Sequence, residues 1–170
     1  MRQPGLFIGR FQPFHKGHLH ALKEILAQEE QVFIVIGSAQ ASHTPTNPFS
    51  TAERIIMLQL ILEELDIPCS RYLLIPVPDI HNYELWVDHV KRFVPPFGIV
   101  YGGLKTSLEL FSEKKLPVKE ITPHKKNIYS GTEVRRRMKQ EEDWRSLIPD
   151  VIIEFIKEVD GVRRVKSFNY

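Results

Sequence analysis

The stretch Val32-Phe33-Ile34-Val35-Ile36-Gly37 decides the fold class. Its five consecutive apolar residues, most of them β-branched, are typical of a strand buried on both faces of a parallel sheet. Shorter apolar runs occur at residues 6–8, 72–75, 99–101 and 118–121, and the helical patterns between them include 17–29, 50–65 and 83–93. The alternation predicts a doubly wound parallel α/β sheet, in which ligands bind beyond the carboxyl ends of the strands.

Two further helices are predicted after the last of these strands. One begins at Ser130, which together with Glu133 has the form of a capping box. The other begins near Pro149, because apolar residues recur at helical spacing as far as Val159, whereas residues 162–170 show no clear pattern. We expect one domain over residues 1–170, with the sheet core at about 5–125 and these helices over about 129–170.

The composition is that of a soluble globular protein. Of 170 residues, 42% are hydrophobic and 26% are charged, and the formal net charge is only +2. A small charge without a concentrated basic stripe argues against nucleic acid as a partner. Cys69 is the only cysteine, no apolar stretch is long enough for a membrane span, and no signal peptide is recognisable. We therefore expect a cytoplasmic protein without a membrane partner.

The first apolar run leads into Gly9-Arg10-Phe11-Gln12-Pro13-Phe14-His15-Lys16-Gly17-His18. His15 and His18 are three residues apart where a loop becomes a helix, so their side chains can share one side of the first turn. A helix start also offers unpaired N–H groups that favour phosphate, and Gly9 and Gly17 allow close approach. Two histidines are too few ligands for a zinc site. The pair could also lie at the surface without a function.

A second phosphate-binding pattern is Tyr129-Ser130-Gly131-Thr132-Glu133-Val134-Arg135-Arg136-Arg137. The hydroxyl groups, the N–H groups of the helix start and an arginine one turn further are the groups expected around the β- and γ-phosphates of a triphosphate. The same residues could equally form a capped helix with a solvated arginine face. Three consecutive arginines cannot all point in one direction, so the spacing leaves open which of them binds phosphate.

The chain resembles the HxGH nucleotidyltransferase superfamily, and within it the archaeal-type nicotinamide-mononucleotide (NMN) adenylyltransferases. The resemblance extends from residue 6 to about residue 162 and implies a Rossmann-like nucleotidyltransferase fold. The motifs that carry it are Gly9-Arg10-Phe11-Gln12-Pro13-Phe14-His15-Lys16-Gly17-His18, Gly37-Ser38-Ala39-Gln40, Ser42-His43-Thr44, Asn47-Pro48-Phe49, Ala52-Glu53-Arg54, Pro76-Val77, Asp79-Ile80, Trp86-Val87 and residues 130–137.

The resemblance implies that AMP is transferred from ATP to NMN, giving NAD and pyrophosphate, and that His15, His18 and Arg10 are catalytic. Residues expected around ATP are Gly9, Arg10, Phe11, His15, His18, Gly103, Tyr129, Ser130, Thr132 and Arg135 or Arg136. Mg²⁺ would be bound mainly through the phosphates of ATP, which fits the lack of a dedicated cluster of carboxylates. Relatives are often hexamers, so the resemblance also implies a homo-oligomer.

Residues expected around NMN are Ser38, Gln40, Asp79, Ile80, Asn82 and Trp86. The resemblance implies that Trp86 stacks on the cationic nicotinamide ring, which suits an indole face. Trp86 could instead be a core residue of its helix. Gln40, Ser42 and His43 could contact the phosphate of NMN or shape their loop, and His43 could equally be an exposed loop residue. The turn after the fourth strand, Tyr101-Gly102-Gly103, departs from the Ser-Gly-Asn type of the family, so side-chain contacts to adenosine cannot be transferred there.

Other functions remain open at this stage. A relative in the superfamily could use FMN, pantetheine phosphate or glycerol phosphate as the acceptor. A nucleotide-binding module without chemistry, or an RNA-binding relative of the class I tRNA synthetases, would share the nucleotide-binding fold. The short chain and the intact histidine and arginine motifs argue against both of these.

Overall fold

The computed structural model describes residues 3–102, 105–121 and 128–168. Contacts group the chain into two compact units, which are described separately below. The first unit consists of residues 1–10, 21–40 and 68–123, and the second consists of residues 11–20, 41–67 and 124–170.

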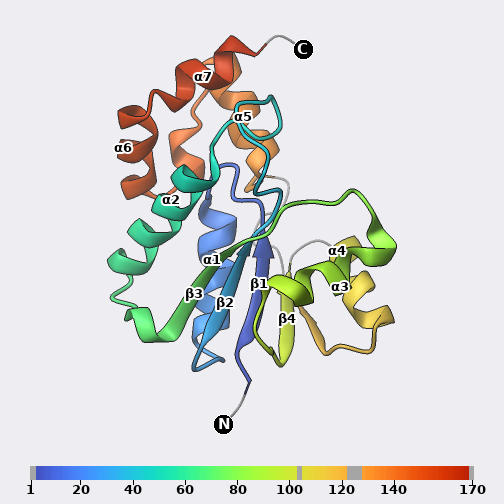
Figure 1. Ribbon diagram of the computed structural model, residues 1–170. Coiled ribbons are helices and arrows are strands. Elements are labelled where there is room, and N and C mark those ends of the chain that lie inside the picture. The colour runs from blue at the N-terminus through green and yellow to red at the C-terminus, as the bar shows by residue number, and fades with distance from the viewer. Residues whose placement is uncertain (1–2, 103–104, 122–127, 169–170) are drawn as a thin grey trace. The chain divides into compact units, whose positions relative to one another are not determined.

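The first unit contains a five-stranded parallel sheet (Figure 1). Its strands are β1 (Gly5–Gly9), β2 (Val32–Ile36), β3 (Tyr72–Pro76), β4 (Ile99–Gly102) and β5 (Val118–Glu120). They are ordered β3-β2-β1-β4-β5, so the chain moves outward from β1 in one direction and then continues on the other side of β1. The predicted fold class is confirmed, and the order reverses between β1 and β4, where ligands of such sheets bind.

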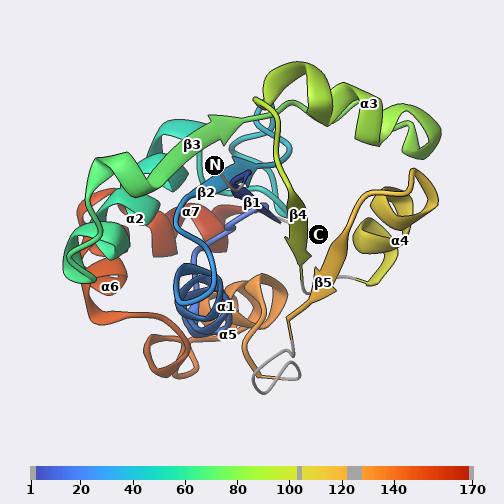
Figure 2. The ribbon, with the colours of Figure 1, turned by 90° about the horizontal axis from the view of Figure 1, so that it is seen from below.

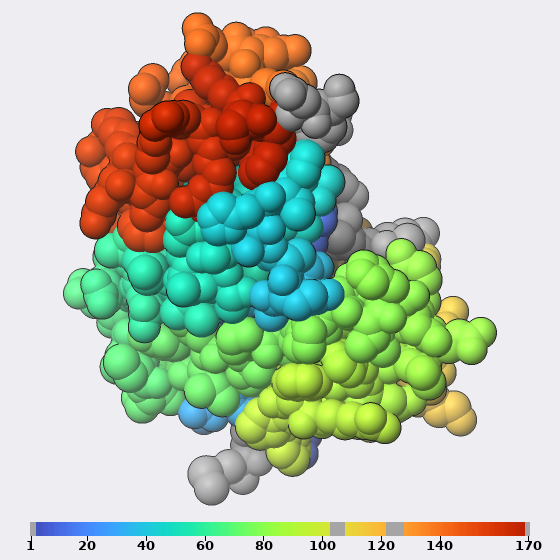
Figure 3. Space-filling view, turned by 45° about the horizontal axis from the view of Figure 1, so that its top comes forward, coloured from blue at the N-terminus to red at the C-terminus, as the bar shows by residue number. Residues whose placement is uncertain are grey.

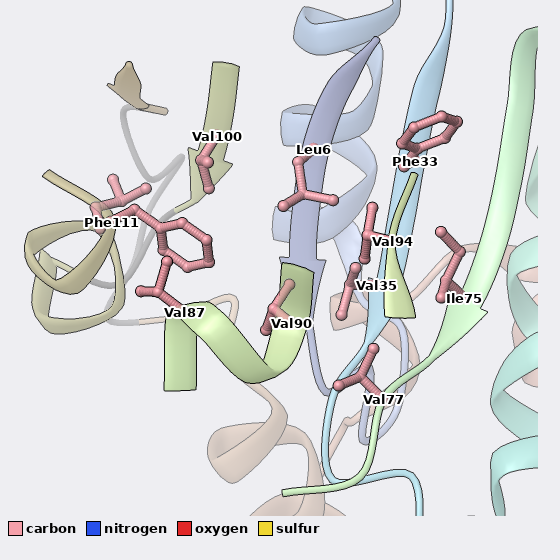
Figure 4. Close-up of a cluster of buried hydrophobic side chains, with 11 residues drawn as sticks. Leu6, Phe33, Val35, Ile75, Val77, Val87, Val90, Val94, Val100 and Phe111 are labelled. Atoms are coloured by element: carbon pink, nitrogen blue, oxygen red, sulfur yellow. The ribbon is translucent and has the colours of Figure 1, made fainter. Parts of the chain in front are cut away.

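Helices cover both faces of this sheet. On one face, α3 (Tyr83–Phe93) and α4 (Lys105–Glu113) bury side chains such as Val87, Val90 and Phe111 against Leu6 and Val35 of the strands (Figure 4). Residues 21–26, the later part of α1 (Lys16–Leu26), lie on the opposite face (Figure 2). All five residues of β2 are buried, as the uninterrupted apolar run predicts.

The second unit is mostly helical. It contains α2 (Thr51–Glu64), α5 (Gly131–Gln140), the 3₁₀ turn η2 (Arg145–Leu147), α6 (Asp150–Glu158) and α7 (Gly161–Ser167). The capping box predicted at the start of α2 is present: Ser50 Oγ accepts from Glu53 N at 3.2 Å, and Glu53 Oε2 accepts from Ser50 N at 2.7 Å. Contacts join α6 to α2 and α7, and α7 to α5.

Three elements were absent from the sequence prediction: the helix α7 and the two 3₁₀ turns, η1 (Cys69–Arg71) and η2. The segment after Val159 forms the separate helix α7, because Asp160 adopts a left-handed conformation with φ 53° and turns the chain before the next helix begins. The short 3₁₀ turn η1 leads into β3. None of the helices within the described residues has both the length and the apolar character of a membrane span.

Candidate active site

His15 and His18 form a stacked pair at the start of α1. Their ring centroids are 3.6 Å apart and their planes differ by 20°. His18 N donates to Nδ1 of His15 at 3.2 Å, and His15 N donates to Nδ1 of His18 at 3.3 Å. Because α1 begins at Lys16, His15 is the N-cap and His18 the third helical residue, so the pair is a capping box built from imidazoles. The prediction that both side chains share the first turn is confirmed.

The capping bonds determine where the ring protons are. Each Nδ1 accepts a main-chain hydrogen bond, so in the neutral ring the proton must be on Nε2, which becomes a donor. Burial, and secondarily the charge of Arg135, lower the pKa of His15 to about 4. Burial, and secondarily His15, place the pKa of His18 well below its usual value. At neutral pH the pair therefore presents two uncharged N–H donors.

Aromatic side chains surround the pair. The ring centroids of Phe11 and Phe14 lie 4.8 Å and 5.4 Å from that of His18, and both phenylalanines are buried. Gly17 permits this crowding, since a Cβ there would lie 3.0 Å from Nδ1 of His15 and 3.1 Å from Cβ of Tyr129. Phe11 and Tyr129, both expected near ATP, thus lie next to the histidines.

The start of α5 brings hydroxyl groups and an arginine to the same unit. Ser130 is the N-cap, and its Oγ accepts from Glu133 N at 3.1 Å. Only this half of the predicted capping box is seen, because the Glu133 carboxylate binds Arg136 and Arg137 instead. Thr132 Oγ1 accepts from Nη2 of Arg135 at 3.4 Å.

The three arginines of α5 differ in their surroundings. Arg135 is buried, donates to the carbonyl of Gln12 at 2.7 Å, and its charge acts on His15. The Arg136 guanidinium is half-exposed and pairs with Glu133 at 2.8 Å and with Glu142 at 2.6 Å. The structure thus brings Arg135 to the histidine pair, whereas Arg136 faces carboxylates and its contact with ATP stays a prediction. We name His15, His18, Ser130, Thr132 and Arg135 the phosphate cluster.

The residues expected around NMN gather in the first unit, where β2 and β3 end and α3 begins. Gln40 is joined to the main chain of Asp79 by two hydrogen bonds, from Nε2 to the carbonyl at 2.9 Å and from Asp79 N to Oε1 at 2.8 Å. Asn82 is the N-cap of α3 and accepts from Leu85 N at 3.2 Å. Gln40 and Asn82 therefore shape this loop whether or not they contact a ligand.

The position of Trp86 is compatible with both roles considered from the sequence, ligand contact and core packing. It is partly buried and packs against the apolar cluster beneath α3, yet it retains exposed surface one turn from Asn82. His89 lies beside it, with ring centroids 5.9 Å apart, and its Nε2 lies 2.9 Å from the carbonyl of Pro78. We name Gln40, Asp79, Asn82 and Trp86 the acceptor cluster.

The remaining expected residues are placed as follows. Gly9 ends β1, and its carbonyl accepts from Gly37 N at 2.9 Å. Arg10 is exposed immediately after β1, and Ser38 adopts a left-handed φ of 49° after β2. Ile80 is 36% exposed. Gly103 lies outside the described residues.

Comparison with known proteins decides the family. A model of the cytidylyltransferase-like family matches residues 6–137. Nicotinamide-nucleotide adenylyltransferases of Thermococcus kodakarensis and Pyrococcus horikoshii are 47% and 48% identical, over 98% and 96% of this chain and 88% and 87% of theirs. The chain belongs to the nicotinamide-nucleotide adenylyltransferase family. The predicted family is thereby confirmed.

Solved structures share the fold of this adenylyltransferase family member. A bifunctional NMN adenylyltransferase/ADP ribose pyrophosphatase from Francisella tularensis has a TM-score of 0.78 at 22% identity, covering 98% of this chain. This chain spans about half of that protein, 53% of its length. The nicotinic acid mononucleotide adenylyltransferase of Plasmodium falciparum, solved with APC, has a TM-score of 0.59 at 15% identity over 96% of this chain and 98% of its own.

The sequence analysis gave no role to one residue that contacts the phosphate cluster. Gln12 is buried, and its side chain exchanges two hydrogen bonds with the main chain of Phe49, at 2.7 Å and 2.9 Å. Its carbonyl also holds Arg135. The signal available in the sequence was a polar side chain enclosed by apolar neighbours, between Phe11 and Pro13, which predicts a buried amide with defined partners.

The polar groups of the phosphate cluster differ from the ligands that Mg²⁺ prefers. They are imidazole, hydroxyl and guanidinium groups, which bind phosphate oxygens, whereas Mg²⁺ prefers oxygen ligands, chiefly carboxylates and water. Within the part of the chain that the structure describes, no three His, Cys, Asp or Glu side chains form a possible metal site. Binding of Mg²⁺ through the phosphates of ATP stays a prediction.

Proposed function

We propose that this chain transfers AMP from ATP to NMN, forming NAD and pyrophosphate. The observation that carries the proposal is the imidazole capping box, with its two Nε2–H donors beside Arg135. It occurs in a chain whose relatives, at 47% and 48% identity over nearly their whole length, are named nicotinamide-nucleotide adenylyltransferases.

The phosphate cluster would act by positioning the triphosphate and stabilising charge. An oxygen of the NMN phosphate attacks the α-phosphorus, the bond to the bridging oxygen breaks, and pyrophosphate leaves with that electron pair. The acceptor is already an anion, so no protein nucleophile or base is required. The Nε2–H groups of His15 and His18 would donate to the oxygens on which charge increases, and Arg135 with the start of α5 would bind the β- and γ-phosphates.

The neutral state of the histidines suits this role. A charged imidazolium would need a proton on Nδ1, and that proton would displace the capping bond that each ring accepts. Uncharged donors leave the net charge of the bound triphosphate to be balanced by Arg135 and by Mg²⁺. Mg²⁺, bound mainly through the phosphates of ATP, would neutralise part of their charge.

The acceptor cluster would provide the specificity for NMN. Trp86 offers an aromatic surface to the pyridinium ring, and the loop that carries Asp79 is held by Gln40 on one side. A homo-oligomeric state and a cytoplasmic location stay predictions.

The test is an assay of the purified protein with ATP, Mg²⁺ and NMN, with products separated by chromatography. FMN, pantetheine phosphate and nicotinate mononucleotide would be supplied in parallel as alternative acceptors. We expect NAD and pyrophosphate in equal amounts, with FMN and pantetheine phosphate inert. Transfer to one of those two without NAD would refute the proposed acceptor, and ATP binding without any transfer would refute the proposed chemistry.

A further inference from the structure

The guanidinium of Arg164, on the last helix α7, holds the turn that precedes α2. Its Nη1 donates to Oε2 of Glu53 at 2.7 Å and to the carbonyl of Pro48 at 3.2 Å, and Nη2 donates to the carbonyl of Val159 at 3.2 Å. Its central carbon also lies 5.9 Å from the ring centroid of Phe49. In Figure 3 the C-terminal segment, in red, lies directly against the cyan segment that contains this turn.

The turn that precedes α2 also binds Gln12, through the main chain of Phe49. Phe49 is fully buried, and its carbonyl accepts from Nε2 of Gln12 at 2.7 Å while its N–H donates to Oε1 at 2.9 Å. Both hydrogen-bonding groups of this buried amide are thus committed to a single residue 37 positions away in the chain. Removing either partner would leave a buried polar group without its hydrogen bond.

Gln12 in turn supports the phosphate cluster through its own main chain. Its carbonyl accepts from Nη1 of Arg135 at 2.7 Å, and Gly131 lies so close that a Cβ there would be 2.8 Å from the same oxygen. The start of α5 and the guanidinium of Arg135 therefore both contact the carbonyl of Gln12. Arg135 in turn acts on His15, whose pKa its charge helps to lower.

We infer that α7 positions the phosphate cluster through this network, and that Arg164 and Gln12 are positioning residues for triphosphate binding. The contacts run without a break from Arg164 through Phe49 and Gln12 to Arg135. The neighbouring Arg163 provides the contrast. Its side chain is 85% exposed and pairs with Asp160 at 3.5 Å, whereas that of Arg164 is 20% exposed.

The inference rests on the proposed function only for the identity of the ligand, so binding is measured rather than catalysis alone. The variants Arg164→Met and Arg163→Met remove the same charge from adjacent positions and keep a similar aliphatic length. We expect Arg164→Met to weaken the affinity for ATP, and for inorganic tripolyphosphate, by roughly 10-fold, because small displacements of positioned groups cost up to about 10²-fold. Arg163→Met should match the wild type, and Arg164→Lys should recover part of the loss.

Two further variants separate positioning from general stability. Gln12→Met removes the central amide. It should weaken the affinity for ATP and for tripolyphosphate at least as much as Arg164→Met does. Ile152→Val shortens a fully buried side chain of α6, so it should lower the melting temperature without changing either affinity. Circular dichroism would confirm that each variant is folded at the temperature of the titration.

The outcomes are distinct. Equal affinities in the wild type and in folded Arg164→Met and Gln12→Met would overturn the inference, as would a loss in Ile152→Val as large as theirs. If the wild type bound ATP but formed no NAD, the expected order of affinities would still support the inference, while the proposed reaction would be refuted.

Discussion

The buried imidazole of His15 should make the free energy of unfolding depend on pH between about 4 and 6.5. Burial and the charge of Arg135 lower its pKa from the ordinary 6.5 to about 4 in the folded chain. Below pH 6.5 the unfolded chain therefore binds a proton that the folded chain does not, so stability falls as the pH falls and levels off below pH 4.

The size of the effect follows from the two pKa values. A difference of about 2.5 pKa units corresponds to about 3 kcal/mol when the transition is complete. The same linkage predicts a loss of about 1 kcal/mol at pH 5.5 and about 2.5 kcal/mol at pH 4.5, relative to pH 7.5. These losses refer to His15 alone. Titrating groups other than His18, whose pKa His15 helps to lower, contribute equally to a protein that lacks only this imidazole.

The measurement is urea unfolding of the wild type and of His15→Asn, followed by circular dichroism at several pH values from 4.5 to 7.5. Asparagine has no titrating group, and its oxygen can still accept the hydrogen bond from His18 N. The difference in free energy of unfolding between the wild type and His15→Asn should change by the stated amounts as the pH falls. A difference that is constant across the range would show that His15 is not buried as described.

Three further predictions concern catalysis and ligand affinity. His18→Asn keeps the acceptor for the main-chain N–H of His15 but removes the Nε2–H donor, so turnover should fall by roughly 10²- to 10³-fold while His20→Asn retains activity; a folded His18→Asn variant with normal turnover would contradict the assigned role. Trp86→Ala should raise the Michaelis constant for NMN far more than that for ATP, and an equal rise in both would indicate a purely structural tryptophan. His89→Phe keeps an aromatic ring beside Trp86 but loses one hydrogen bond to the loop of the acceptor cluster, so the Michaelis constant for NMN should rise about 5-fold. An unchanged Michaelis constant would show that His89 does not support that loop.

The parts of the structure that depend on local pattern were predictable from the sequence. Five apolar runs became five parallel strands, and the Ser50 capping box formed as expected, because both signals arise from neighbouring residues. The pairing of His15 and His18 was predictable for the same reason, since a three-residue spacing on a helix brings side chains together.

The parts that depend on distant partners were not predictable. Spacing alone could not separate Arg135 from Arg136, because the difference arises from Gln12, 123 residues away, and from the exposed carboxylate of Glu142. The separate helix α7 was missed because a left-handed aspartate has no strong sequence signal. Gln12 itself was passed over because its importance lies in the residues that it joins.

The imidazole capping box also constrains how this site can change by mutation. Each histidine satisfies the main-chain N–H of the other, so exchanging one for an apolar residue disturbs the backbone of its partner as well as removing a donor. The two positions are therefore expected to change together in evolution. Once one histidine is replaced, the second should be under weaker selection. A descendant chain in which an apolar residue replaces one of the two histidines would be expected to lose more activity than one that keeps a side-chain acceptor there.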